Sequence, residues 1–125
     1  WLMQALTAFG RHADTREIAD ETLRFQSKLD GAFLTGQQDD CPGCTSVVPL
    51  EGLAAVYRAK RTPRLRKALE HGLRFVDSLV YQEKDVPILP NPKRALGGVR
   101  QSEVSGQVRQ DFVGHLINLL LTLEA

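Results

Sequence analysis

Apolar residues recur at helical spacing in two neighbouring stretches near the start of the chain. Residues 2–9 carry apolar side chains three and four positions apart, and this stretch ends at Gly10. Asp14, with Glu17 three residues later, then has the pattern of a helix N-cap, and apolar positions continue at helical spacing to Leu29. Helices joined by so few residues pack antiparallel, so the pattern predicts a helical hairpin.

A second hairpin of the same kind is predicted farther along the chain. Its first helix opens at Pro49, and its second begins with Thr62 as the cap and Pro63 at the first helical position. Leu23-Arg24-Phe25 recurs as Leu73-Arg74-Phe75, an offset of 50 residues. A fixed offset of this size is typical of helical-repeat proteins.

The last apolar segment, from about Gln107 onward, predicts one helix with apolar residues around most of its circumference. Two hairpins cannot cover such a helix on all sides. We therefore expect residues 1–125 to be a single all-α domain of antiparallel helical hairpins, forming the C-terminal part of a larger protein. The rest of that chain, or a second copy in a homo-oligomer, would cover the last helix. Residues 30–45 and 83–106 are predicted as long loops.

Composition agrees with one globular domain, because 42% of the 125 residues are hydrophobic and 25% are charged. The net charge of +1 gives no reason to expect a nucleic-acid or membrane partner, and no apolar run approaches the roughly 20 residues of a membrane span. The basic run between Arg58 and Lys67 offers a phosphate or nucleic-acid site as an alternative, but it has no aromatic residues among its charges and is interpreted as solvated surface. The two cysteines form one close pair, not a disulfide framework, so we expect a soluble protein, with the cytoplasm favoured.

Three stretches resemble a known family of folds: "EGLAAVYRAKRTPRLRKALEHGLRFVDSLV" at residues 51–80, "DGAF" at 30–33 and "ALGGVRQS" at 95–102. Hairpins of this length resemble the α/α toroid of six-hairpin glycosidases, sugar epimerases, terpenoid cyclases and protein prenyltransferases. Gln26 ahead of the DGAF stretch is similar to the repeat motif of terpenoid cyclases, although Val99 replaces the aromatic residue in the second copy. The resemblance implies inner helices around a central cavity.

A polar stripe on the last helix carries the strongest candidate for chemistry. Asp111, His115, Asn118 and Thr122 are spaced four, three and four residues apart and so share one helical face. In a toroid this face would line the cavity, with Asp111 and His115 as the catalytic pair, Asp111 orienting His115 for acid–base work, and Asn118 binding substrate. The alternative is that Asp111 caps the helix and His115 is a structural core residue.

Further binding residues are proposed from their place near this stripe. Arg100 and Arg109 precede the last helix, where they would bind an anionic group of a substrate. Glu51 lies near the start of an inner helix and would form with Asp111 the carboxylate pair that glycosidases need, unless it is a solvated or capping residue. We expect an enzyme acting on a carbohydrate by hydrolysis, elimination or epimerisation; the alternative is a non-enzymatic interaction module.

The cysteine pair in Asp39-Asp40-Cys41-Pro42-Gly43-Cys44 supports a third hypothesis. Two thiolates supply half of a zinc site, so a metal-dependent toroid would need further ligands. Protein prenyltransferases hold zinc through an Asp-x-Cys element and a distant histidine, a pattern that Asp39, Cys41 and His115 formally fit. Redox-active thiols, a local disulfide and an ordinary loop remain alternatives, and no other cofactor is expected.

Overall fold

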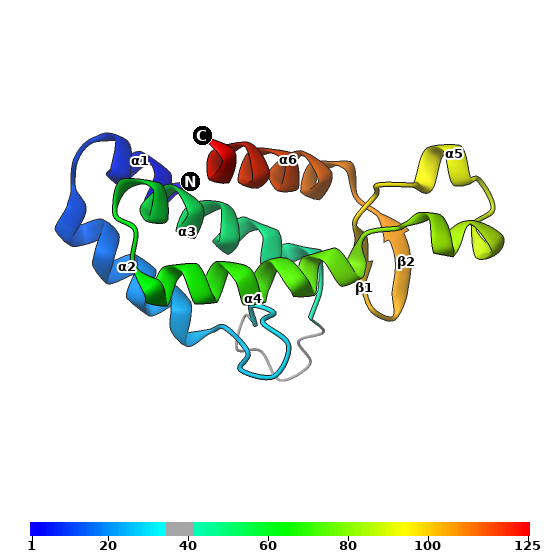
Figure 1. Ribbon diagram of the computed structural model, residues 1–125, viewed down its shortest axis with the longest axis horizontal. Helices are drawn as coiled ribbons and strands as arrows, with labels where there is room; N and C mark the ends of the chain where they lie inside the picture. The colour runs from blue at the N-terminus through cyan, green and yellow to red at the C-terminus, as the bar shows by residue number, and fades with distance from the viewer. Residues whose placement is uncertain (35–41) are drawn as a thin grey trace.

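The computed structural model describes residues 1–34 and 42–125, and helices account for most of them. Helix α3 lies at the centre, between α1 and α6 on one side and α2 and α4 on the other (Figure 1). Helices α1, α3 and α6 run in one direction, and α2 and α4 run in the opposite direction. The helices are α1 (Leu2–Ala8), α2 (His12–Arg24), α3 (Val47–Ala59), α4 (Pro63–Leu79), α5 (Pro92–Ala95) and α6 (Gln110–Glu124), with short 3-10 helices η1 (Cys44–Ser46) and η2 (Glu83–Ile88). The expected helical hairpins are therefore present.

Helix α3 is buried around most of its surface because four other helices contact it. Val47, Leu50, Leu53 and Ala54 have no solvent exposure. Full burial of each leucine is worth about 1.5–3 kcal/mol relative to exposure, so this helix supplies much of the stabilising contact. It also fixes the positions of α1 and α6, which meet no outer helix on their far sides within the described residues.

The boundaries of α4 follow the sequence prediction, whereas those of the other helices differ by one to five residues. Thr62 caps α4 by accepting a hydrogen bond from the backbone N–H of Leu65 at 3.3 Å. The prediction of an N-cap at Asp14 is wrong. Helix α2 begins at His12, and Asp14 lies in its first turn, in an ion pair with Arg11. Helix α3 begins at Val47, ahead of Pro49, because a proline is tolerated within the first turn.

The first hairpin also ends earlier than expected. Helix α2 stops at Arg24, and the chain turns back on itself through a backbone bridge between Gln26 and Phe33. Leu29, which was assigned to the helix, is 91% exposed at the tip of this turn. Leu29 has the spacing of a core position, but it lies in the turn after α2 and outside the core, so the apolar pattern overestimated the length of the helix.

The segments that follow α2 and α4 share a backbone arrangement. After α2, Gly31 has a φ of 87°, and Phe33 returns to pair with Gln26. After α4, Gly97 has a φ of 78°, and the second residue beyond it, Val99, pairs with Val80. Both φ values lie in the left-handed region that favours glycine. The chain therefore turns back on itself after both helices, but the second turn is longer and does not keep the offset of 50 residues.

Gln26 joins this returning segment to α4. Its Nε2 donates to the carbonyl oxygen of Gly31 at 3.2 Å and to that of Ala68 at 2.8 Å. The backbone N–H of Phe33 donates to the buried Ser46 hydroxyl at 2.9 Å. The glutamine and the DGAF stretch thus have a structural role between α2, α4 and the start of α3.

The prediction of a long loop over residues 83–106 is wrong, because most of this range forms helices and strands. This region holds η2, α5 and an antiparallel hairpin of β1 (Arg100–Ser102) and β2 (Ser105–Val108), all drawn at one end of the molecule in Figure 1. Gly43 forms a backbone bridge with Ser102, and a Cβ at Gly43 would lie 2.1 Å from the carbonyl oxygen of Gln101. Glycine at position 43 therefore allows the hairpin to approach the start of α3. No helix in the described ranges has the length and hydropathy needed to cross a membrane.

Candidate functional site

A buried carboxylate connects three helices on the α1–α6 side of α3. Glu51 on α3 is only 4% exposed. One of its oxygens, Oε2, lies 2.7 Å from Nδ1 of His115 on α6, and the other, Oε1, accepts a hydrogen bond from Nε2 of Gln4 on α1 at 3.1 Å. Both carboxylate oxygens are thus satisfied by side chains from neighbouring helices.

Close packing of α1 against α3 makes this arrangement possible. Gly52, next to Glu51, lies against Met3 of α1, and a Cβ there would lie 2.5 Å from Cε of Met3, so that side chain would have to shift. Burial of an ionised carboxylate without partners is strongly unfavourable. The hydrogen bonds from Gln4 and His115 offset that cost, which explains how an acidic residue occupies an otherwise apolar stretch of α3.

His115 has one committed ring nitrogen and one available nitrogen. Nδ1 faces Glu51, and Nε2 has no hydrogen-bond partner among residues 1–34 and 42–125. When Nδ1 donates to the carboxylate, Nε2 of the neutral ring carries a lone pair. The His115 side chain is 21% exposed, and its ring lies 6.1 Å from that of Phe112 and 6.3 Å from that of Trp1. The histidine is therefore partly open to solvent and lies beside an exposed indole.

Asp111 does not orient His115, so that prediction is wrong. Its carboxylate forms two hydrogen bonds with Arg109, at 2.6 and 3.2 Å, on the exposed surface. The hydrogen bond from Arg109 lowers the pKa of Asp111 below its ordinary value. Glu51 holds the histidine instead, and the expected pairing of Glu51 with Asp111 is absent among the described contacts.

The other predicted binding residues lie away from this pair of side chains. Arg100 donates a hydrogen bond to the backbone carbonyl oxygen of Ser78 at 2.7 Å, and its guanidinium lies over the Tyr81 ring. It therefore caps the C-terminal end of α4. The guanidinium of Arg109 lies over the Phe112 ring, 4.7 Å from its centroid. Asn118 is exposed, and its backbone carbonyl oxygen accepts a hydrogen bond from the Thr122 hydroxyl at 2.8 Å.

Of the residues proposed for a metal or redox site, the structure describes Cys44 and His115. Asp39, Asp40 and Cys41 lie outside the described residues. Cys44 is a free thiol, 1% exposed in the hydrophobic core, and burial raises its pKa. Among residues 1–34 and 42–125 no group of three or more histidine, cysteine or acidic side chains could hold a metal ion. A local disulfide between Cys41 and Cys44 stays a prediction, as does zinc binding, because Cys41 lies outside the described residues.

Two residues of the site, Gln4 and Trp1, were not predicted. Gln4 lies on a short helix whose apolar pattern drew attention to its other face, and Trp1 precedes that helix. A polar residue such as Glu51 within an otherwise apolar helix was the available signal for a buried polar contact. No protein-family model, curated protein or solved structure matches this chain. The geometry around Glu51 is therefore the basis for assigning a function.

Proposed function

We propose that the chain is part of an α/α-toroid enzyme that acts on a carbohydrate, with His115 as its acid–base residue. The observation that carries the proposal is the 2.7 Å contact between buried Glu51 and the partly exposed His115. A histidine held by a buried carboxylate on one nitrogen, with the other nitrogen accessible, is a common arrangement for proton transfer.

In this proposal Glu51 is a positioning residue and His115 is the group that meets the substrate. Glu51 fixes the ring orientation and the tautomer, and it stabilises the imidazolium that forms when Nε2 takes a proton. Gln4 holds the second carboxylate oxygen, which keeps Glu51 from rotating away. Nε2 would remove a proton from a substrate carbon or hydroxyl and return it at a later step.

The surroundings of His115 favour a carbohydrate substrate. Trp1 is 80% exposed, and its indole can stack against the C–H face of a sugar ring. Proton removal is the chemistry of elimination and epimerisation. Glycoside hydrolysis by paired carboxylates needs two acids facing one bond, and Glu51 and Asp111 take different partners here. We therefore favour elimination or epimerisation.

The single tryptophan gives a direct test, because its fluorescence reports on the environment of His115. Neutral and uronic-acid oligosaccharides would be titrated against the chain while Trp1 emission and the His115 ring NMR signals are followed. We expect a ligand from this set to change both signals in a saturable way. His115→Gln and Glu51→Gln should weaken the response, and His115→Gln should lower any turnover by about 10²–10⁴-fold.

Asp111→Asn is the matched control, since it removes a carboxylate from the same helix outside the pair of Glu51 and His115. It should leave binding unchanged. Circular dichroism and thermal unfolding of each variant separate loss of binding from loss of fold. The proposal is wrong if no carbohydrate perturbs Trp1 or His115, or if Asp111→Asn weakens binding as much as His115→Gln.

A further inference from the structure

A groove separates the two hairpins at the end of the molecule opposite the β-hairpin. Helix α2 forms one wall, and the end of α3 with the start of α4 forms the other, enclosing about 600 Å³. Apolar side chains line part of the surface: Ala19, Leu23, Val56, Ala59 and Leu65. A cavity of this size matches those that hold small ligands. It includes no residue of the site around Glu51.

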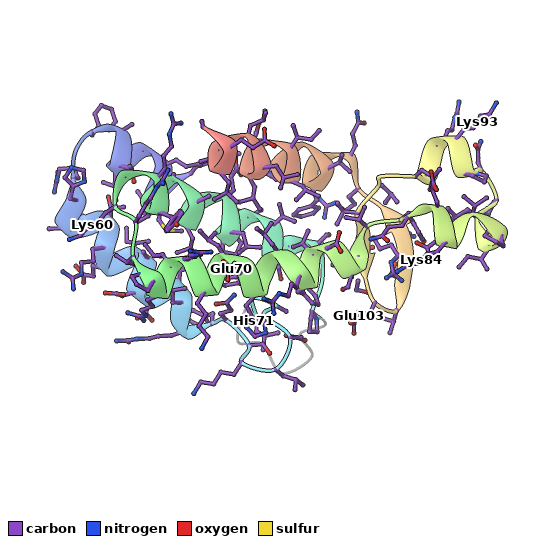
Figure 2. The ribbon with its side chains drawn as sticks, viewed as in Figure 1. Lys60, Glu70, His71, Lys84, Lys93 and Glu103 are labelled. Carbon is purple, nitrogen blue, oxygen red and sulfur yellow. The ribbon has the colours of Figure 1, made fainter. Side chains whose placement is uncertain are left out.

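The rim of this groove is mainly cationic. Arg16 on α2 and Lys60 and Arg64 on the other wall are its charged basic residues, with His12 beside them, and Asp20 is the one carboxylate that lines it. Figure 2 shows Lys60 at the same end of the molecule as the turn between α1 and α2. Lys60 and Arg64 belong to the basic run that sequence analysis interpreted as solvated surface. The fold places these two facing a cavity.

Two guanidinium groups already converge on an oxyanion in this groove. Nη1 of Arg64 lies 2.6 Å from Oδ1 of Asp20, and Nε of Arg16 lies 4.0 Å from Oδ2 of the same carboxylate. The Arg64 pair links the two hairpins. Both arginine side chains are more than 60% exposed, so solvent and solutes reach them. One carboxylate leaves part of their charge and several of their donors unmatched.

We propose that this groove binds a small phosphate monoester. Its dianionic phosphate would lie between Arg16 and Arg64, with Lys60 adding charge, and its organic part would contact the apolar lining. Arginine binds phosphate through paired N–H donors, and a dianion interacts with two guanidinium groups more strongly than a single carboxylate does. In this arrangement Asp20 competes with the ligand for both arginines.

Phenyl phosphate is the probe, with inorganic phosphate and phenol as comparisons, measured by calorimetry and by amide chemical shifts at low ionic strength. Phenyl phosphate should bind more tightly than either comparison. Arg64→Gln and Arg16→Gln should each weaken its binding by about tenfold. Asp20→Asn should strengthen binding, because it frees both guanidinium groups from their present partner.

Arg66→Gln is the matched control. Arg66 lies on the same helix as Arg64, pairs with Glu70 and does not line the groove. Its loss should leave binding unchanged. The proposal is overturned if Arg66→Gln weakens binding as much as Arg64→Gln, which indicates a diffuse basic surface. It is also overturned if Asp20→Asn weakens binding, or if inorganic phosphate binds as tightly as phenyl phosphate.

Discussion

At the scale of single residues, Gly31 carries two constraints at once. Its φ of 87° is unfavourable for any residue with a side chain, and a Cβ there would lie 2.4 Å from the carbonyl oxygen of His71 on α4. Figure 2 shows His71 on the side of α4 that faces this segment. The obstacle is helical backbone, which cannot move aside cheaply.

We therefore expect Gly31→Ala to lower the free energy of unfolding by more than the about 1 kcal/mol that the backbone conformation alone costs. Gly10→Ala is the matched control. Gly10 has a φ of 69°, but no atom lies within 4 Å of the position of an added Cβ. Urea unfolding of both variants measures the difference. Equal losses for the two would show that contact with α4 contributes nothing.

Cys44 tests the cysteine hypothesis at the level of one thiol. Burial raises its pKa and keeps it protonated at neutral pH, and protonated thiols react slowly with disulfide reagents. In a Cys41→Ser chain, Cys44 is the only thiol. We expect its modification to be slow in the native state and fast in denaturant. Fast native modification would contradict the buried placement of Cys44.

At the scale of elements, the start of α4 is the clearest case in which local sequence decides structure. Thr62→Ala removes the acceptor for the Leu65 N–H, and we expect a loss of about 0.5–2 kcal/mol in unfolding free energy. Thr62→Ser keeps a hydroxyl at the same position and should recover most of it. If Thr62→Ser is as unstable as Thr62→Ala, the methyl group and not the cap is responsible.

Other elements depend on contacts that local sequence does not contain. Thr62 caps α4 as predicted, because the hydroxyl and its amide partner are three residues apart. The strands β1 and β2 are short and polar, and the bridge from Ser102 to Gly43 that anchors them spans 59 positions. Periodicity could not reveal them.

In the candidate site, too, single residues could be identified from local sequence, whereas their contacts could not. The polar stripe identified His115, and Glu51 was proposed only as a carboxylate partner of Asp111 near the start of an inner helix. Their partnership depends on how α3 and α6 are rotated against each other, which no spacing within α6 encodes. Asp111, one turn from His115, was the nearer choice in sequence, but it points toward Arg109 and solvent.

At the scale of the whole molecule, α1 and α6 leave apolar side chains uncovered, as the sequence led us to expect for the last helix. Ile117 and Leu121 are 52% and 58% exposed, and Leu120 and Leu2 are also exposed. Figure 1 shows the two chain ends close together, with α1 and α6 on the same side of α3. Exposed apolar side chains grouped on one face of a helix, as Ile117, Leu120 and Leu121 are on α6, often contact another protein surface.

We expect the 125-residue chain to self-associate through α6, since a second copy offers the same apolar face. Sedimentation velocity across a concentration series should show dimers. Ile117→Lys with Leu121→Lys should weaken association at least tenfold, because each substitution removes apolar contact and adds charge at the interface. Unfolding free energy should change little, as both side chains are half exposed.

Val104→Lys controls for the loss of any exposed apolar residue. Val104 is 85% exposed in the turn between β1 and β2 and does not belong to α6. It should leave association unchanged. A monomeric wild-type chain at high concentration would show that α6 does not bind a second copy. Association that survives the double lysine variant would place the contact elsewhere.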